Sequence, residues 1–150
     1  MISQMKTTLV LQLRRLAAFF YDLMVMLGLI IVAGFLYLGA QMLILGTDVV
    51  EPGNLLFRLY LCLIIFGYVY ISWRRAGQTI GMKAWRLRAV STDGSQLTFR
   101  QILSRFLVGI LTFGFFGLGY LWSFLDSSGR TLPEILSNTQ TQSVTKISNP

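Results

Sequence analysis

The chain has 150 residues, of which 54% are hydrophobic and 13% are charged; a typical soluble domain carries about 25% charged residues. Thirteen lysines and arginines against six acids give a net charge of +7, and most of these cations flank apolar segments, where they set topology and meet anionic headgroups. With no histidine and one cysteine, Cys62, the composition excludes histidine-based triads, zinc sites and a disulfide within the chain.

The first apolar run covers residues 16–45 and contains one charged side chain, Asp22, with two arginines just before it. About 20 apolar residues span the ~30 Å hydrocarbon core of a bilayer, so we predict a first transmembrane helix over residues 14–45. The run is too long for the core of a cleaved signal peptide. We expect residues 1–11, which are polar to mixed, to form a short helix or a frayed start at the membrane surface.

A short segment with two acids, residues 46–54, separates this run from a second predicted transmembrane helix over residues 55–73. Four arginines lie at the opposite ends of the two runs: Arg14, Arg15, Arg74 and Arg75. The connecting segment has no basic residue, so the positive-inside rule predicts a cytoplasmic N-terminus and a periplasmic loop. The polar, basic segment that follows, residues 74–100, is then cytoplasmic as well.

Within this basic segment, residues 85–90 alternate apolar and charged side chains with the period of a strand. Asp93-Gly94 is a turn signal, and residues 95–98 could return antiparallel. We therefore predict a small cytoplasmic β-hairpin, with residues 139–147, rich in Thr, Val and Ile, as a candidate third strand. An amphipathic surface helix over residues 82–90 is the alternative.

A third apolar run, residues 102–125, is long enough to cross the membrane once. The glycines at 114, 117 and 119 also permit a reversal, which lipid tolerates only where the chain is buried in protein or lines a wet cavity. A reversal would return Asp126 and the polar tail, residues 126–150, to the cytoplasmic side, where the candidate third strand could find a sheet. Both paths are open, and the need of that strand for a partner favours the return.

An ionisable residue such as Asp22 is costly inside an apolar span, so it is either functional or part of a structural pair. Arg15 lies seven residues earlier on the same helix face, about 10 Å away. Better placed partners lie on other segments: Arg74, Arg75, Arg100 and Arg105. We favour a structural role, in which an arginine ties the first helix to a neighbour. The candidate intramembrane charge cluster is Arg15, Asp22, Arg105 and Asp126.

Three stretches carry a recognisable pattern. The first runs from Arg15 to Asp22, with an arginine at the helix start and an aspartate two turns in. The second runs from Gly77 to Arg88 and opens with the most specific residues, Gly77, Gln78, Thr79 and Gly81. The third ends at Asp126. With these features the chain resembles the RDD family of membrane proteins, named for an arginine and two aspartates, over about residues 14–140.

The resemblance implies a single multi-pass domain over residues 1–150 in a bacterial inner membrane. It implies no defined biochemical activity, although transport of an unidentified ligand has been suggested for the family and some members are linked to sodium–proton exchange. The chain departs from the family pattern at Pro133-Glu134, which stands where a His-Asp pair is typical. Glu134 conserves the charge, and Thr139 keeps the threonine that opens a short strand.

The predicted fold is a mainly α membrane protein: a small bundle with two full transmembrane helices, a third apolar segment that crosses or re-enters, and a cytoplasmic β-hairpin. One functional hypothesis is transport of a small ion or solute, as an oligomer because one copy cannot enclose a path. The other is a non-catalytic scaffold or accessory subunit with structural charges. We expect no enzyme, cofactor, metal or nucleic acid. The expected partners are anionic lipid headgroups and a second copy or another membrane protein.

Overall fold

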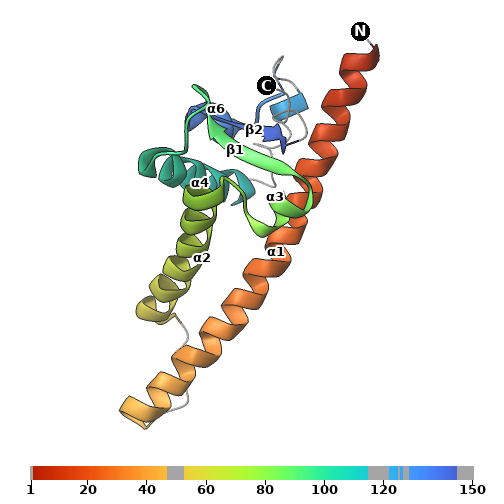
Figure 1. The fold of residues 1–150 in the computed structure, drawn as a ribbon. Coiled ribbons are helices and arrows are strands. Elements are labelled where there is room, and N and C mark those ends of the chain that lie inside the picture. The colour runs from red at the N-terminus through yellow and green to blue at the C-terminus, as the bar shows by residue number, and fades with distance from the viewer. Residues whose placement is uncertain (1, 47–52, 115–121, 125, 127–128, 145–150) are drawn as a thin grey trace.

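The computed structural model describes residues 2–46, 53–114, 122–124, 126 and 129–144. Two long helices dominate it, α1 over Ile2–Leu45 and α2 over Leu55–Ala76 (Figure 1). The N-terminal residues, expected as a separate or frayed start, are continuous with α1. Helix α2 starts where predicted, because the side chain of Asn54 accepts a hydrogen bond from the Phe57 N–H at 3.1 Å and caps it.

The surfaces of α1 and α2 are apolar and exposed along most of their length. In the most apolar window of each helix, only 6% of the residues are buried. The exposed side chains include Phe35, Leu43 and Leu56. The core helix of a soluble protein buries such a surface, so exposed apolar helices of this length are suited to lipid.

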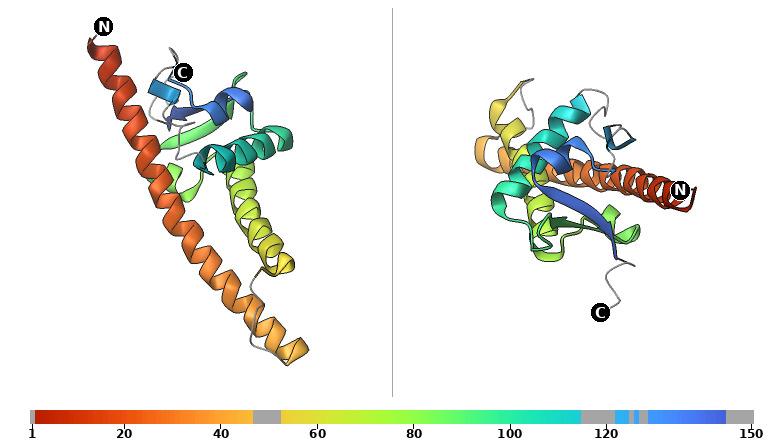
Figure 2. Two further views of the ribbon diagram at one scale, coloured as in Figure 1. Left: turned by 180° about the vertical axis from the view of Figure 1, so that it is seen from behind. Right: turned by 90° about the horizontal axis from the view of Figure 1, so that it is seen from above.

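A polar cap lies at the end of the molecule where α2 ends. We define the cap by four short elements: α3 (Ile80–Ala84), β1 (Leu87–Ser91), α6 (Leu132–Leu136) and β2 (Thr139–Ser143). Helix α1 extends beyond α2 at this end, and the cap lies beside its N-terminal half (Figures 1 and 2). The buried core joins cap and helices through Ala18, Met82, Leu87, Ala89, Leu97 and Ile102.

The third apolar run forms α4 (Phe99–Gly114), which lies across the end of α2 instead of alongside it (Figures 1 and 2). Its start is fixed by a reciprocal pair of hydrogen bonds. The Gln101 N–H donates to the Thr98 hydroxyl at 3.4 Å, and the Thr98 N–H donates to Gln101 Oε1 at 3.0 Å. The helix thus begins three residues before the predicted segment.

The glycines at 117 and 119 lie outside the described residues, and so does the path of the predicted reversal. After the short 3₁₀ helix η1 (Trp122–Phe124), the Gly129 carbonyl accepts hydrogen bonds from Gln12 at 3.0 Å and Arg15 at 2.8 Å. The polar tail therefore begins beside the N-terminal half of α1, at the same end of the molecule as the start of α4.

The sheet contains the predicted strand but not the predicted hairpin. Strand β1 pairs antiparallel with β2, with Ser91 opposite Thr139, so the pairing of residues 85–90 with residues 95–98 is wrong. After the Ser91 N–H bond to the Ser95 carbonyl, residues 95–98 are bound elsewhere: the Leu97 carbonyl accepts a hydrogen bond from Arg74, and Thr98 caps α4. Strand β2 comes from residues 139–147, expected as the third strand. The alternative surface helix does not form, since α3 ends before β1 begins.

Candidate functional site

Glu134 is a carboxylate only 1% exposed, on the one-turn helix α6. The Thr131 N–H donates to its Oε2 at 2.9 Å, so the same acid also caps α6. Its Oε2 lies 3.3 Å from Nη1 of Arg15 on α1, and its Oε1 lies 3.6 Å from Nη2 of Arg105 on α4. One buried acid therefore connects three helices.

The two arginines also hold strand β2. Arg15 Nη2 donates to the Thr141 carbonyl at 2.8 Å. Arg105 donates to the hydroxyls of Thr139 at 2.6 Å and Thr141 at 2.8 Å. The Arg105 guanidinium also lies 5.1 Å from the centre of the Trp73 ring, a cation–π distance. These contacts fix the C-terminal strand against α1, α2 and α4.

The ionisation of Glu134 reflects two opposing effects. Burial raises the pKa of its carboxyl, but the guanidiniums of Arg105 and Arg15, together with the hydrogen bonds it accepts, lower the pKa by more. The result lies below the ordinary value. Glu134 is therefore ionised at neutral pH, and it presents one full negative charge to its two arginines.

Asp22 on α1 is 7% exposed and accepts hydrogen bonds from three neutral donors. Its Oδ1 accepts from the Tyr68 hydroxyl at 3.1 Å and from the Gly81 N–H at 2.9 Å. Its Oδ2 accepts from the Thr79 hydroxyl at 2.5 Å. The carboxylate thus ties α1 to α2 and to the start of α3. We expected an arginine as the tie, and the observed donors are hydroxyls and an amide, because α3 itself docks on α1 at this depth.

The first two residues of the predicted family motif connect α2 to β1. Gly77 ends α2 in the left-handed conformation, φ +67°, and its N–H donates to the Trp73 carbonyl at 3.0 Å. Its own carbonyl accepts from the Ala89 N–H at 2.7 Å. The Gln78 side chain donates to the Leu87 carbonyl at 2.6 Å. The motif therefore stops the helix and holds the first strand of the cap.

The other two motif residues connect α3 to α1. The Thr79 hydroxyl accepts from the Met82 N–H at 3.2 Å, which caps α3, while it donates to Asp22. Gly81 packs directly on α1, where a Cβ would collide with the Ala18 carbonyl and would lie 2.9 Å from Asp22 Oδ2. Only glycine allows this close approach of the two backbones.

Asp126 pairs with a nearby residue of the tail. Its Oδ2 accepts from the Arg130 N–H at 2.9 Å and lies 3.5 Å from the Arg130 Nε. Between them, Gly129 provides the carbonyl that Arg15 holds. Of the four residues predicted as one charge cluster, the structure joins Arg15 and Arg105 through Glu134, gives Asp22 its own three donors, and pairs Asp126 with Arg130.

Glu134 was not among the predicted site residues, although two signals in the sequence mark it. Thr131 and Glu134 have the spacing of a capping box, and the acid stands where the family pattern has its His-Asp pair. Tyr68 was not among the predicted site residues. Nothing in its sequence context reveals a hydrogen bond to a residue 46 positions away.

A cavity of about 330 Å³ lies between α1, α2, α4 and the cap. Its apolar lining includes Leu23, Met26, Ile65, Val69, Phe106 and Ile110. Its polar lining includes Arg15, Asp22, Thr79, Arg105 and Glu134. The lining of the cavity therefore combines apolar side chains with two basic and two acidic ones.

The two long helices with exposed apolar surfaces are candidate membrane spans, and buried ion pairs join α1 and α4 to the cap. The family model described as RDD family matches residues 10–138. The chain belongs to the RDD family, which confirms the resemblance seen in its sequence. No curated protein and no solved structure gives a significant match to the chain.

Proposed function

We propose that this protein is a non-catalytic membrane scaffold or accessory subunit, in which the charged residues hold a polar cap on two membrane helices. The observation that carries this proposal is the engagement of both buried acids. Asp22 accepts hydrogen bonds from α2 and α3, and Glu134 faces arginines from α1 and α4. A carboxylate bound in this way stabilises the fold and is costly to release for a transported cation.

If Asp22 is structural, Asp22→Asn should lower the amount of protein in the membrane. The amide places an N–H₂ group where one oxygen accepts the Thr79 hydroxyl, so at least one buried hydrogen bond must rearrange. We expect a loss on the order of 1–3 kcal/mol in unfolding free energy, typical of a disturbed buried polar group. Immunoblotting of membrane fractions and thermal unfolding in detergent measure both effects.

Tyr68→Phe provides a matched test, because it removes one donor to Asp22 and leaves the carboxylate intact. A structural role predicts that this variant loses protein in the same direction as Asp22→Asn, by a smaller amount. Normal protein levels and melting temperatures in both variants would contradict the scaffold proposal.

The second candidate function is transport of a small ion or solute by an oligomer. The observation that favours it is the cavity of about 330 Å³, which is lined by both Asp22 and Glu134. Ion flux in proteoliposomes, measured across pH with sodium or potassium gradients, tests this candidate. Flux that Asp22→Asn abolishes at a normal protein level would favour transport over the scaffold.

We also propose a multi-pass topology in a bacterial inner membrane, with the N-terminus and the cap in the cytoplasm. The support is the distribution of charge: four arginines flank the predicted spans on one side, and residues 46–54 carry two acids and no base. Anionic lipid headgroups and a second copy of the chain, but no nucleic acid, are the proposed partners.

This topology predicts that a membrane-impermeant thiol reagent modifies Asp48→Cys in intact cells, because the loop faces the periplasm. Arg75→Cys should react only after the membrane is opened. Cys62→Ser provides the background without the native thiol. Protection of position 48 together with labelling of position 75 in intact cells would reverse the assignment.

A further inference from the structure

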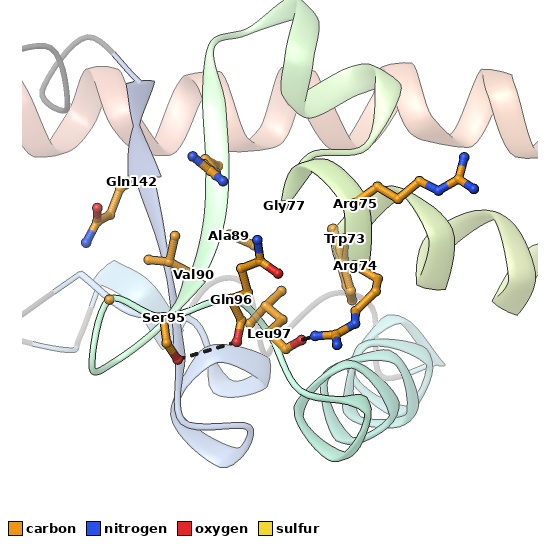
Figure 3. A pocket seen from close by; sticks show the side chains of 12 residues that line it. Trp73, Arg74, Arg75, Gly77, Ala89, Val90, Ser95, Gln96, Leu97 and Gln142 are labelled. Atoms are coloured by element: carbon orange, nitrogen blue, oxygen red, sulfur yellow. Dashed lines mark hydrogen bonds between the residues drawn. The ribbon is translucent and has the colours of Figure 1, made fainter.

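A second, smaller cavity of about 180 Å³ lies next to the site described above and shares Trp73 with it (Figure 3). It is bounded by the C-terminal end of α2, by β1 and by residues 94–97. Three arginines contribute to its lining, Arg74, Arg75 and Arg88, and none of its lining residues, all of which are described, is acidic. The scaffold role uses none of these arginines in an ion pair within the described part of the chain.

Two buried N–H groups of this lining have no hydrogen-bond acceptor among the described residues: Nε of Arg88 and Nε1 of Trp73. Arg88 lies against the end of α2, where its Nε would be 3.1 Å from a Cβ placed on Gly77. Arg74 is fixed at the edge of the cavity by its hydrogen bond to the Leu97 carbonyl, 3.2 Å long (Figure 3). Buried donors without acceptors are costly, so a ligand that accepts hydrogen bonds would favour a movement of the Arg88 side chain that brings its Nε to that ligand.

The electrostatic balance at this cavity favours an anion. The C-terminal end of α2 contributes about −0.5 elementary charge through the helix dipole. Two carbonyls of its last turns, those of Trp73 and Ser72, are already occupied by the N–H groups of Gly77 and Gln78. Three guanidiniums outweigh this partial charge. The nearby acid, Asp93, is directed to the Ser95 N–H at 2.9 Å.

We propose that this cavity binds the phosphate group of an anionic lipid. Guanidinium groups match the oxygens of phosphate in paired hydrogen bonds, which a single ammonium cannot reproduce. The lipid source follows from exposed apolar side chains close in sequence to the lining. Ile71 lies one turn before Arg75 on α2, Phe99 lies two residues after Leu97, and each is 53% exposed and provides apolar surface for acyl chains. The inference depends on the proposed membrane position of α2, whose last turn carries Arg74 and Arg75.

Binding is tested on the purified full-length protein in detergent, with native mass spectrometry to count bound molecules. The probe is dioctanoyl phosphatidic acid, and dioctanoylglycerol provides the same chains without phosphate. We expect the phosphate to strengthen binding by about tenfold or more, since charge-assisted hydrogen bonds dominate recognition. Inorganic phosphate is the competitor. If it binds as tightly as the lipid, the lipid source is overturned and the site is one for free phosphate.

Arg88→Gln should weaken binding of the phosphatidic acid about tenfold, because it removes the buried Nε and the guanidinium charge. Arg75→Gln is a second variant, at an exposed side chain whose loss does not threaten folding. The matched control is Arg100→Gln, which makes the same change of charge at an exposed position outside the cavity. If Arg88→Gln and Arg100→Gln weakened binding equally, binding would depend only on the surface charge of the protein, and the proposed site would be overturned.

This test separates the two proposals. Loss of lipid binding in Arg88→Gln at a normal melting temperature supports the phosphate site and leaves the scaffold role of Asp22 untouched. Absence of the native protein from the membrane fraction would overturn both proposals. Unchanged lipid binding in both Arg75→Gln and Arg88→Gln would overturn only the phosphate site.

Discussion

Glu134→Gln is expected to lower the unfolding free energy by about 3–5 kcal/mol, the cost of breaking a buried ion pair by removing one partner. Glutamine has nearly the same shape and can still accept the Thr131 N–H. It leaves the guanidiniums of Arg15 and Arg105, whose side chains are 9% and 11% exposed, without their counter-charge. Denaturant or thermal unfolding of the protein in detergent measures the loss.

The control for this change is Asp93→Asn, the same carboxylate-to-amide substitution in an exposed turn. It should leave the melting temperature nearly unchanged. Arg105→Gln in the Glu134→Gln background should destabilise less than Arg105→Gln alone, because the second change then removes an unpaired cation. Additive losses in this double-mutant cycle would show that Glu134 and Arg105 do not interact, contrary to their 3.6 Å separation.

The same residue predicts a pH dependence. The pKa of Glu134 is lower in the folded protein than its ordinary value of 4.5. A depressed folded pKa contributes stability that is complete above the unfolded pKa and is lost as the pH falls through the folded pKa. The difference in stability between the native protein and Glu134→Gln should therefore be constant near neutral pH and should shrink below about pH 4.5.

The two long helices could be predicted from the sequence because lipid imposes an unbroken apolar length, which is a local property. The strand at residues 85–90 could also be predicted, since alternation is local. Its partner could not. Strand β2 lies about 50 residues later, and the nearer candidate, residues 95–98, is bound to α2 through the Leu97 carbonyl and to the start of α4 through Thr98. Pairing between distant strands depends on the tertiary path of the chain.

The candidate site was predictable only where charge interrupts an apolar run. Asp22 met that condition, and its burial was therefore predictable. The hydrogen-bond partners of Asp22 could not be predicted, because hydroxyl and amide donors carry no charge. Charge alone indicated an arginine as the partner. Glu134 lies in a polar tail, where an acid is ordinary. Glu134 is buried because the chain at Gly129 lies against Arg15 of α1. The local sequence does not encode this long-range contact.

The two buried acids both bind the cap to α1, Glu134 through Arg15 and Asp22 directly. Arg15 and Asp22 are seven residues apart, about two turns or 10 Å along one face. At the first position, Arg15 holds Glu134 and strand β2. At the second, Asp22 holds the start of α3. The early and late halves of the cap are therefore bound to the same helix face, and the pairing of β1 with β2 closes the structure between them.

Gly81→Ala should be among the most damaging small substitutions in the chain. A methyl group there would press on the Ala18 carbonyl and lie 2.8 Å from the Asp22 carboxyl carbon, so α3 must move away from α1. The movement would break the Gly81 N–H hydrogen bond to Asp22. Overpacking costs about 1–3 kcal/mol, and a hydrogen bond to a charged group contributes about 1.5–3 kcal/mol. The gain of about 1 kcal/mol from alanine in a helix does not offset these losses.

Gly67→Ala on α2 is the matched control, because a Cβ at Gly67 meets nothing within 4 Å. It should leave stability unchanged or raise it by up to about 1 kcal/mol through helix propensity. Thermal unfolding of both variants in the same detergent separates steric contact from backbone propensity. If Gly81→Ala melts like Gly67→Ala, then α3 does not rest on α1 through this glycine, and the hydrogen bonds from Tyr68 and Thr79 must provide the whole connection to Asp22.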